Sequence, residues 1–142
     1  MLKNKHILFE YIKHDYFIMS LRFENNMKSV LIIDDNVDIV DSMVEGMDMC
    51  GIKVAGKAFD GLEGIEQFEK LNPDIVLLDI MMPDYDGFYL LDKIFEINPK
   101  AKVIVISGDI KEETREKLKT YELLASFLKP VKFAELSKVI NS

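Results

Sequence analysis

A carboxylate that could do chemistry, Asp79, comes directly after the apolar run 75–78. Such a run has no polar face, which is typical of a strand in the middle of a parallel sheet with helices on both sides. We therefore expect Asp79 at the carboxyl end of a buried strand, where open α/β sheets bind their ligands. Pro83 and Gly87 then predict a sharp turn of the chain away from that end.

Three other apolar runs end in polar residues of matching chemistry. These are Asp34 and Asp35 after the run 30–33, Ser107 after the run 103–106, and Lys129 after the run 127–128. In a parallel sheet all of these strand ends open onto the same edge. The sequence thus predicts a cluster of three carboxylates, one hydroxyl and one ammonium.

A cluster of this composition needs more positive charge than one lysine supplies. Two carboxylates about 4 Å apart repel each other by about 4 kcal/mol at an effective dielectric constant of about 20, so a divalent cation is expected. An all-oxygen ligand set suits Mg²⁺, with Mn²⁺ as the alternative, rather than zinc. Cys50, His6 and His14, which would favour zinc, lie far from these strand ends in the sequence.

The whole set of motifs resembles a response-regulator receiver domain of bacterial and archaeal two-component signalling. The motifs are Asp34-Asp35, Asp79 with Met82-Pro83 and Gly87, Ser107, and Lys129-Pro130, and the resemblance covers residues 27–142. Acidic pairs and Lys-Pro are common on their own, but all of the motifs in this order, each at the end of an apolar run, are specific. The resemblance implies an α/β fold of flavodoxin-like, doubly wound (βα)5 type, with a parallel sheet of five strands in the order 2-1-3-4-5.

The resemblance also implies a role for each residue. Asp79 would be the nucleophile that accepts a phosphoryl group from phosphohistidine on a histidine kinase or histidine phosphotransfer protein. Lys129, before an expected cis peptide bond to Pro130, and Ser107 would contact phosphoryl oxygens. The Mg²⁺ ligands would be Asp34, Asp35, Asp79 and the backbone carbonyl of Met81. Plainer interpretations are helix caps for the aspartates, a solvated loop lysine and a turn serine.

One position departs from the family's pattern. Receiver domains usually carry Tyr or Phe three residues before the lysine, and here that residue is Ser126. The neighbouring Phe127 should point to the opposite face if the strand is regular. The departure leaves the phosphorylation site as it is and puts the usual aromatic switch in doubt.

Length and composition set the broad class. A chain of 142 residues fits one domain with a sizeable core. The formal net charge of −7, with no basic stripe, argues against direct nucleic-acid binding. The lone Cys50 excludes an internal disulfide and fits a reducing cytosol. No apolar stretch approaches membrane-spanning length, so we expect a cytoplasmic protein without membrane insertion.

Strand and helix patterns alternate five times from residue 29 onward. Residues 52–59 read as an edge strand, because glycine and lysine interrupt it. Asp60 and Glu63 predict a capping box at the start of the second helix. The fourth helix should start near Asp109 with a thin apolar face, and the fifth at Lys132.

Residues 1–26 lie outside this alternation and are treated as an N-terminal extension of uncertain structure, with residues 27–142 as the receiver domain. Two interpretations stay open. The segment is an extra helix or strand that packs on the domain or on a partner, or it reflects an upstream reading of the start codon, since Met27 would be a natural beginning.

The leading functional hypothesis is a single-domain response regulator. We expect its output to be contact with a downstream protein target or onward phosphotransfer, with a homodimer also allowed, and no enzymatic activity beyond its own aspartyl phosphate. The expected output face carries Lys111, Arg115, Lys119 and Lys132. One alternative is a phosphorylation-independent receiver-like interaction module, which Ser126 favours. Another is a phosphohydrolase or phosphotransferase for small molecules.

Overall fold

The computed structural model describes residues 27–82, 85–108 and 111–142, so the expectations for residues 1–26, Pro83 and Asp109 lie outside the described residues. Its main sheet has five parallel strands in the order β2-β1-β3-β6-β7. The strands are β1 (Ser29–Ile33), β2 (Lys53–Ala58), β3 (Ile75–Asp79), β6 (Val103–Ser107) and β7 (Ala125–Leu128). Counted along the chain this is the order 2-1-3-4-5, which confirms the flavodoxin-like fold.

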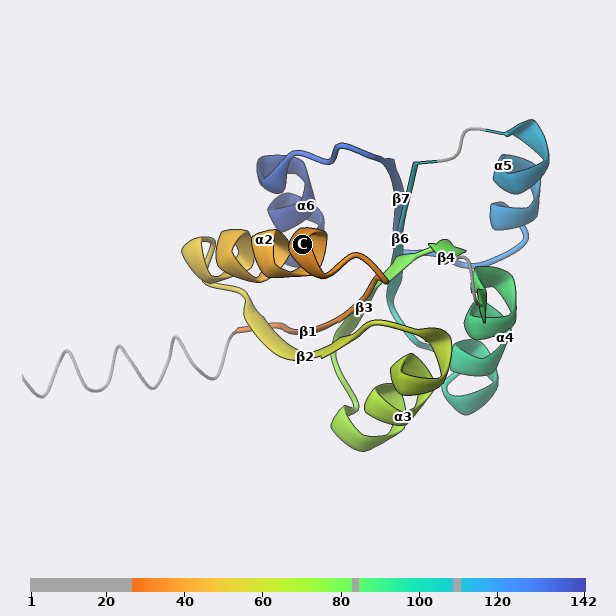
Figure 1. The fold of residues 1–142 in the computed structure, drawn as a ribbon, viewed down its shortest axis with the longest axis horizontal. Coiled ribbons are helices and arrows are strands. Elements are labelled where there is room, and N and C mark those ends of the chain that lie inside the picture. The colour runs from red at the N-terminus through yellow and green to blue at the C-terminus, as the bar shows by residue number, and fades with distance from the viewer. Residues whose placement is uncertain (1–26, 83–84, 109–110) are drawn as a thin grey trace, which may run out of the picture.

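Helices cover both faces of the sheet (Figure 1). Helices α2 (Val37–Met49) and α6 (Phe133–Ile140) lie on one face, and α3 (Gly61–Leu71) and α4 (Gly87–Ile97) lie on the other, together with the short α5 (Glu112–Leu118).

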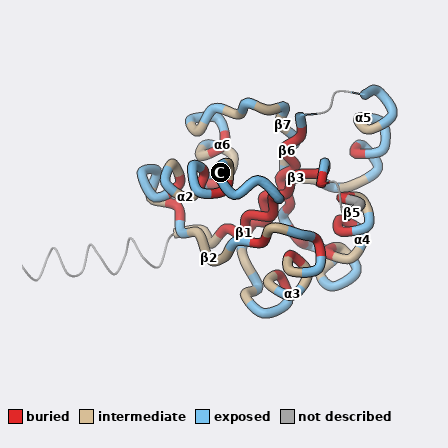
Figure 2. Tube along the Cα trace, viewed as in Figure 1, coloured by how far each residue is buried: buried red, intermediate tan, exposed pale blue. Residues whose placement is uncertain are grey.

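The buried residues form two clusters, one on each face of the sheet. Successive residues of the central strands alternate between them: Ile32 and Leu77 belong to the cluster under α2 and α6, whereas Leu31 and Leu78 belong to the one under α3 and α4. Buried positions accordingly run along β1, β3 and β6 through the middle of the molecule (Figure 2). A strand whose two faces are both covered has no solvent-facing positions, which is why the sequence shows continuous apolar runs.

Capping residues set the bounds of the first two helices. The Asn36 side chain accepts a hydrogen bond from the Ile39 N–H at 3.2 Å and caps α2. Gly51 follows the end of that helix with φ of 72°, the left-handed conformation that favours glycine. Asp60 accepts from the Glu63 N–H at 2.8 Å, which confirms the predicted cap of α3.

The structure corrects the predicted start of the fourth helix. Helix α5 begins at Glu112, three residues later than Asp109, because Lys111 before it has ψ of 133°, an extended backbone that cannot continue a helix. Of its seven residues only Leu118 is buried, as the thin apolar face predicts. Tyr121 lies beyond the end of the helix.

A small antiparallel pair, β4 (Met81–Met82) and β5 (Tyr85–Asp86), was not predicted. It lies between Asp79 and α4, at the place where a sharp turn is expected. Gly87 opens α4 directly against the backbone of Ile80, and a Cβ on Gly87 would collide with the Ile80 carbonyl oxygen. The glycine therefore lets the chain fold back tightly just after Asp79.

Candidate functional site

The predicted polar residues meet at the carboxyl edge of the sheet. Asp34 follows β1, Asp79 ends β3, Ser107 ends β6 and Lys129 follows β7, and these four strands are consecutive neighbours in the sheet. Asp34, Asp79 and Ser107 are only 3%, 6% and 4% exposed. Buried polar groups at the end of an otherwise apolar sheet mark this edge as the candidate site.

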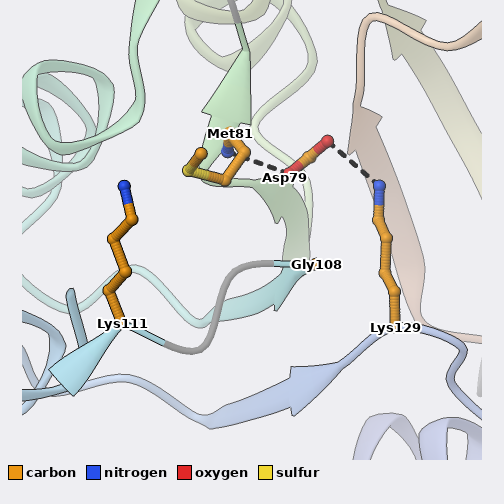
Figure 3. Close-up of a pocket in the computed structure, with 5 residues that line it drawn as sticks. All are labelled: Asp79, Met81, Gly108, Lys111 and Lys129. Carbon is orange, nitrogen blue, oxygen red and sulfur yellow. Dashed lines mark hydrogen bonds and ion pairs between the residues drawn. The ribbon is translucent and has the colours of Figure 1, made fainter.

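Lys129 joins two of the carboxylates. Its Nζ lies 3.1 Å from Oδ2 of Asp34 and 3.0 Å from Oδ2 of Asp79. The side chain is 24% exposed, so the ammonium reaches into the site from its rim. Figure 3 shows the bond from Lys129 to the Asp79 carboxylate. The peptide bond from Lys129 to Pro130 is cis, as expected.

The second oxygen of each carboxylate is held by the backbone. Oδ1 of Asp34 accepts from the Asn36 N–H, and Oδ1 of Asp79 accepts from the Met81 N–H, both at 2.9 Å. Each aspartate thus bonds the amide two residues ahead of it and turns its other oxygen to Lys129. The two strand ends present their carboxylates in the same way, although their sequences share little beyond the aspartate.

Burial and the neighbouring charges shift the pKa values of Asp79 and Lys129. Burial raises the pKa of Asp79, outweighing the hydrogen bonds from Met81 and Lys129, and the charge of Asp34 adds to the rise. Burial works to lower the pKa of Lys129, but its hydrogen bonds and attraction to Asp79 and Asp34 outweigh this and raise it. The ammonium is well compensated, whereas the Asp79 carboxylate is not.

Three carboxylates of the site fit a hard divalent cation. Asp34, Asp35 and Asp79 each offer one oxygen, and these oxygens all lie within 4.8 Å of one another. Asp35 is exposed, so a cation here would keep contact with solvent. An all-oxygen, partly hydrated set of this kind suits Mg²⁺. The chemistry of the donors therefore agrees with the metal that the sequence predicts.

A pocket of about 410 Å³ opens beside Asp79. It is lined by Asp79, Met81, Gly108, Lys111 and Lys129 (Figure 3). Sequence reasoning placed Lys111 on an outer face of the fourth helix and missed it as a pocket residue. The later start of α5 is the reason, since it leaves Lys111 in the connection that borders the pocket.

Strand β7 is regular, and this fixes the positions of Ser126 and Phe127. Phe127 is partly buried against the cluster under α2 and α6, whereas Ser126 is exposed on the opposite face. No aromatic ring of β7, all of whose residues are described, faces the α5 side. The departure noted in the sequence is therefore present in the fold.

The doubly wound sheet and the acidic cluster at its carboxyl edge define a receiver-type α/β domain. The family described as "Response regulator receiver domain" matches residues 30–141. The chain therefore belongs to the response regulator receiver family of two-component signalling.

Curated relatives include chemotaxis proteins. The chain is 40% identical over 81 residues to the chemotaxis protein CheY of Thermotoga maritima, which covers 57% of this chain and 68% of that protein. It is 38% identical over 90 residues to the CheY of Treponema pallidum, covering 62% of each. It is also 33% identical over 101 residues to a protein-glutamate methylesterase/protein-glutamine glutaminase of Treponema pallidum, covering 69% of this chain but only 25% of that larger protein.

Solved structures show the same fold. A CheY-like receiver domain from Methanospirillum hungatei has a TM-score of 0.74 at 29% identity, covering 80% of this chain and 90% of that one. The CheX-CheY-BeF3-Mg²⁺ complex from Borrelia burgdorferi contains a chain with a TM-score of 0.73 at 31% identity, covering 80% and 86%. Within the described part of this chain, no helix has the length and apolarity needed to cross a membrane.

Proposed function

We propose that this protein is a single-domain response regulator that accepts a phosphoryl group on Asp79. The observation that carries the proposal is the environment of this carboxylate. It lies at the edge of a 410 Å³ pocket, with one oxygen fixed by a backbone N–H and the other by Lys129. A buried carboxylate held by donors but open to a pocket is oriented for attack on an electrophile.

The atoms that react in the chemical step are an Asp79 oxygen of this chain and the phosphoryl group of the donor. An Asp79 oxygen forms a bond to phosphorus while the bond from phosphorus to the donor's imidazole nitrogen breaks. The bonding electrons leave with the nitrogen, and Asp79 becomes an acyl phosphate. Lys129 neutralises charge on the phosphoryl oxygens, and the Ser107 hydroxyl is the proposed further contact. The donor is a phosphorylated histidine kinase or histidine phosphotransfer protein.

Mg²⁺ fits the acidic cluster, and Asp34, Asp35, Asp79 and the Met81 backbone carbonyl would hold it. When bound, the ion supplies positive charge that stabilises the transferring phosphoryl group. The separation of the three carboxylates supports this assignment. The relative from Borrelia burgdorferi, whose complex carries BeF3 and Mg²⁺, supports it independently.

The proposed output is contact with a downstream protein or onward phosphotransfer, in the cytoplasm where kinases supply the phosphoryl group. The proposed protein contact can also be one between two copies of this chain, which would form a homodimer. The protein would turn over only its own aspartyl phosphate and so is not an enzyme in the usual sense. The relative from Borrelia burgdorferi is bound to CheX, a protein partner.

Helix α5 is the element proposed to move, because Leu118 is the only buried residue among its seven and weakly packed segments are the first to rearrange. Arg115 lies on α5, Lys119 follows its last residue, and Lys132 directly precedes α6. These three cations are the proposed contacts for an acidic partner. Hydrogen exchange with and without beryllofluoride should show its change in α5, β7 and α6. A change confined to α2 and α3 would contradict this route.

Intact mass after treatment with acetyl phosphate tests the central claim. We expect one added phosphoryl group in the presence of Mg²⁺, none with a chelator, and none in Asp79→Asn. Asp74→Asn is the matched control, because it changes the same residue type at the other end of the same strand. A label that survives in Asp79→Asn, or that forms equally without metal, would refute the assignment.

A phosphorylation-independent interaction module is the second candidate, favoured by the exposed Ser126 where receivers usually carry a ring. It predicts a partner that binds wild type and Asp79→Asn equally, with or without beryllofluoride. The regulator predicts that beryllofluoride changes the affinity of wild type alone. A small-molecule phosphatase is separated from the regulator because it would release phosphate from acetyl phosphate without a phosphoryl group accumulating on Asp79.

A further inference from the structure

Two lysines border the pocket beside Asp79, and only one of them was expected there. Figure 3 shows Lys111 and Lys129 extended in the same direction on opposite sides of the pocket, with Asp79 and Met81 between them. They come from different elements, since Lys111 precedes α5 and Lys129 follows β7. The pocket is therefore flanked by positive charge on both sides.

The charge of Lys129 is already used within the site. Its ammonium is shared between Asp34 and Asp79 at 3.1 and 3.0 Å, and its side chain is 24% exposed. Lys111 is exposed and lies at the open side of the pocket. An anion that enters the pocket from solvent thus meets Lys111 on one side and an ammonium engaged with two carboxylates on the other.

The net charge of the site before and after phosphorylation indicates why a second cation such as Lys111 would stabilise the phosphorylated form. The three carboxylates outnumber the Lys129 ammonium by two negative charges, which one divalent cation would balance. Phosphorylation replaces the single charge of Asp79 by about two charges on the acyl phosphate at neutral pH. One negative charge is then uncompensated, and it lies on the phosphoryl oxygens in the pocket.

We infer that Lys111 is a second phosphoryl-binding cation, which binds the incoming phosphoryl group and stabilises the aspartyl phosphate. The inference rests on the proposed function of Asp79. It assigns the two lysines different positions at the phosphoryl group: Lys129 contacts it from the side of the carboxylates, and Lys111 contacts it from the opposite side of the pocket. In transfer from acetyl phosphate, the Asp79 oxygen bonds to phosphorus, the bond from phosphorus to the acetate oxygen breaks, and acetate leaves with the electron pair.

The decisive test compares a cation and an anion at the same site. In Lys111→Gln, beryllofluoride binding at saturating Mg²⁺, followed by ¹⁹F NMR, should weaken by about three- to tenfold, the loss expected for one charge-assisted contact near solvent. The Mg²⁺ affinity, followed by amide NMR without beryllofluoride, should stay unchanged or rise by up to about threefold, because a nearby like charge has been removed. A structural role of Lys111 would weaken both ligands together.

Three controls sharpen the result. Lys111→Arg keeps the charge and should retain most of the beryllofluoride affinity. Lys100→Gln removes the same charge from an exposed lysine in the connection before β6, outside the residues that line the pocket, and should behave as wild type. The difference between Lys111→Gln and wild type should shrink as salt rises from about 0.05 M to about 0.5 M, since the contact is screened. Phosphorylation by acetyl phosphate should show a raised KM in Lys111→Gln.

The outcomes separate the two levels of the argument. Beryllofluoride uptake by wild type, its absence in Asp79→Asn and an unaltered Lys111→Gln would overturn the role of Lys111 alone. Parallel loss of Mg²⁺ and beryllofluoride in Lys111→Gln would also overturn it. Equal uptake by wild type and Asp79→Asn would overturn the proposed function, and the role of Lys111 with it.

Discussion

The two ends of strand β3 carry the same residue type in opposite electrostatic conditions. Asp74 directly precedes the strand and Asp79 ends it. Asp74 is exposed, and its Oδ2 accepts from the Ser29 N–H at 2.8 Å and the Ser29 hydroxyl at 3.0 Å. These bonds, above all the one from the backbone, lower the pKa of Asp74. Asp79 is buried beside another carboxylate, and burial raises its pKa.

The contrast separates a structural carboxylate from a functional one. The Asp74 N–H in turn donates to the Ser29 hydroxyl at 3.0 Å, so Ser29 and Asp74 clasp the beginnings of β1 and β3. Two donors of one residue, the N–H and the hydroxyl of Ser29, are both matched to the Asp74 carboxylate. At the other end, Lys129 serves two carboxylates at once and leaves the site with excess negative charge. The carboxylate at the amino edge of the sheet thus stabilises the fold, whereas the carboxylates at the carboxyl edge are available to bind a cation.

The largest expected effect is that of Mg²⁺ on stability. At Mg²⁺ about 100 times its Kd, the free energy of unfolding of wild type should rise by about 2.7 kcal/mol, provided that the unfolded chain does not bind the ion. Urea titrations with Mg²⁺ and with chelator measure the gain. Asp34→Asn should lose most of it, whereas Asp74→Asn should keep it in full. An equal gain in Asp34→Asn would place the ion elsewhere and break the comparison.

The next effect is on the free energy of unfolding of Asp79→Asn, measured with a chelator present. Most substitutions of buried residues destabilise a protein, whereas this one should stabilise it. Removing the charge should raise the free energy of unfolding by about 1–2 kcal/mol at pH 7, because the desolvation cost of the buried charge and its repulsion from Asp34 both disappear while Lys129 keeps Asp34 as a partner. A raised pKa means that the cost is present at neutral pH. It vanishes as pH falls below the unfolded value of about 4, where Asp79 is protonated in both states. A loss of stability at pH 7 would show that the ion pair outweighs the repulsion.

Asp74→Asn should lose about 0.5–1 kcal/mol of unfolding free energy at pH 7, which is below the range usual for hydrogen bonds to a charge because the group is exposed and screened by solvent. A lowered pKa gives stability that is full above the unfolded-state pKa of about 3.8 and is lost as pH falls through the lower folded-state pKa. The difference between Asp74→Asn and wild type should therefore close in acid. Ser29→Ala should cost a similar amount, with the two losses not additive.

Glu122→Gln is the matched control for the clasp, because Glu122 is an exposed acid in the connection before β7. Its unfolding free energy should stay within about 0.5 kcal/mol of wild type. A comparable loss in Glu122→Gln would mean that net charge, rather than the Ser29–Asp74 bonds, explains the effect of Asp74→Asn.

The residues that meet at the carboxyl edge of the sheet could be predicted from the sequence, whereas the hydrogen bonds at the amino edge could not. Apolar runs in the sequence predict buried strands, so the polar residue that follows each run, such as Asp79, is predicted to lie at the carboxyl edge of the sheet. The Ser29–Asp74 clasp spans 45 positions and leaves no local pattern. The strands β4 and β5 have two residues each, too few for a period. Lys111 was assigned to an outer helix face because Asp109, with Glu112 three residues later, has the pattern of a helix start. The backbone at Lys111 is extended, so the helix begins only at Glu112.

The smallest effect is expected from removing residues 1–26, which precede the amino edge of the sheet. The family match begins at residue 30, and β1 begins at Ser29, whose bonds to Asp74 close this edge. If the clasp completes the edge, a chain of residues 27–142 should unfold within about 0.5 kcal/mol of the full chain, as for a change away from the core. Its Mg²⁺ response and phosphorylation should be unchanged, because both belong to the opposite edge. Urea titration of the two chains, each with and without Mg²⁺, measures this directly. A loss of several kcal/mol, with a smaller denaturant slope because less surface is exposed on unfolding, would show that residues 1–26 contribute to the folded core and that the clasp alone does not close the amino edge.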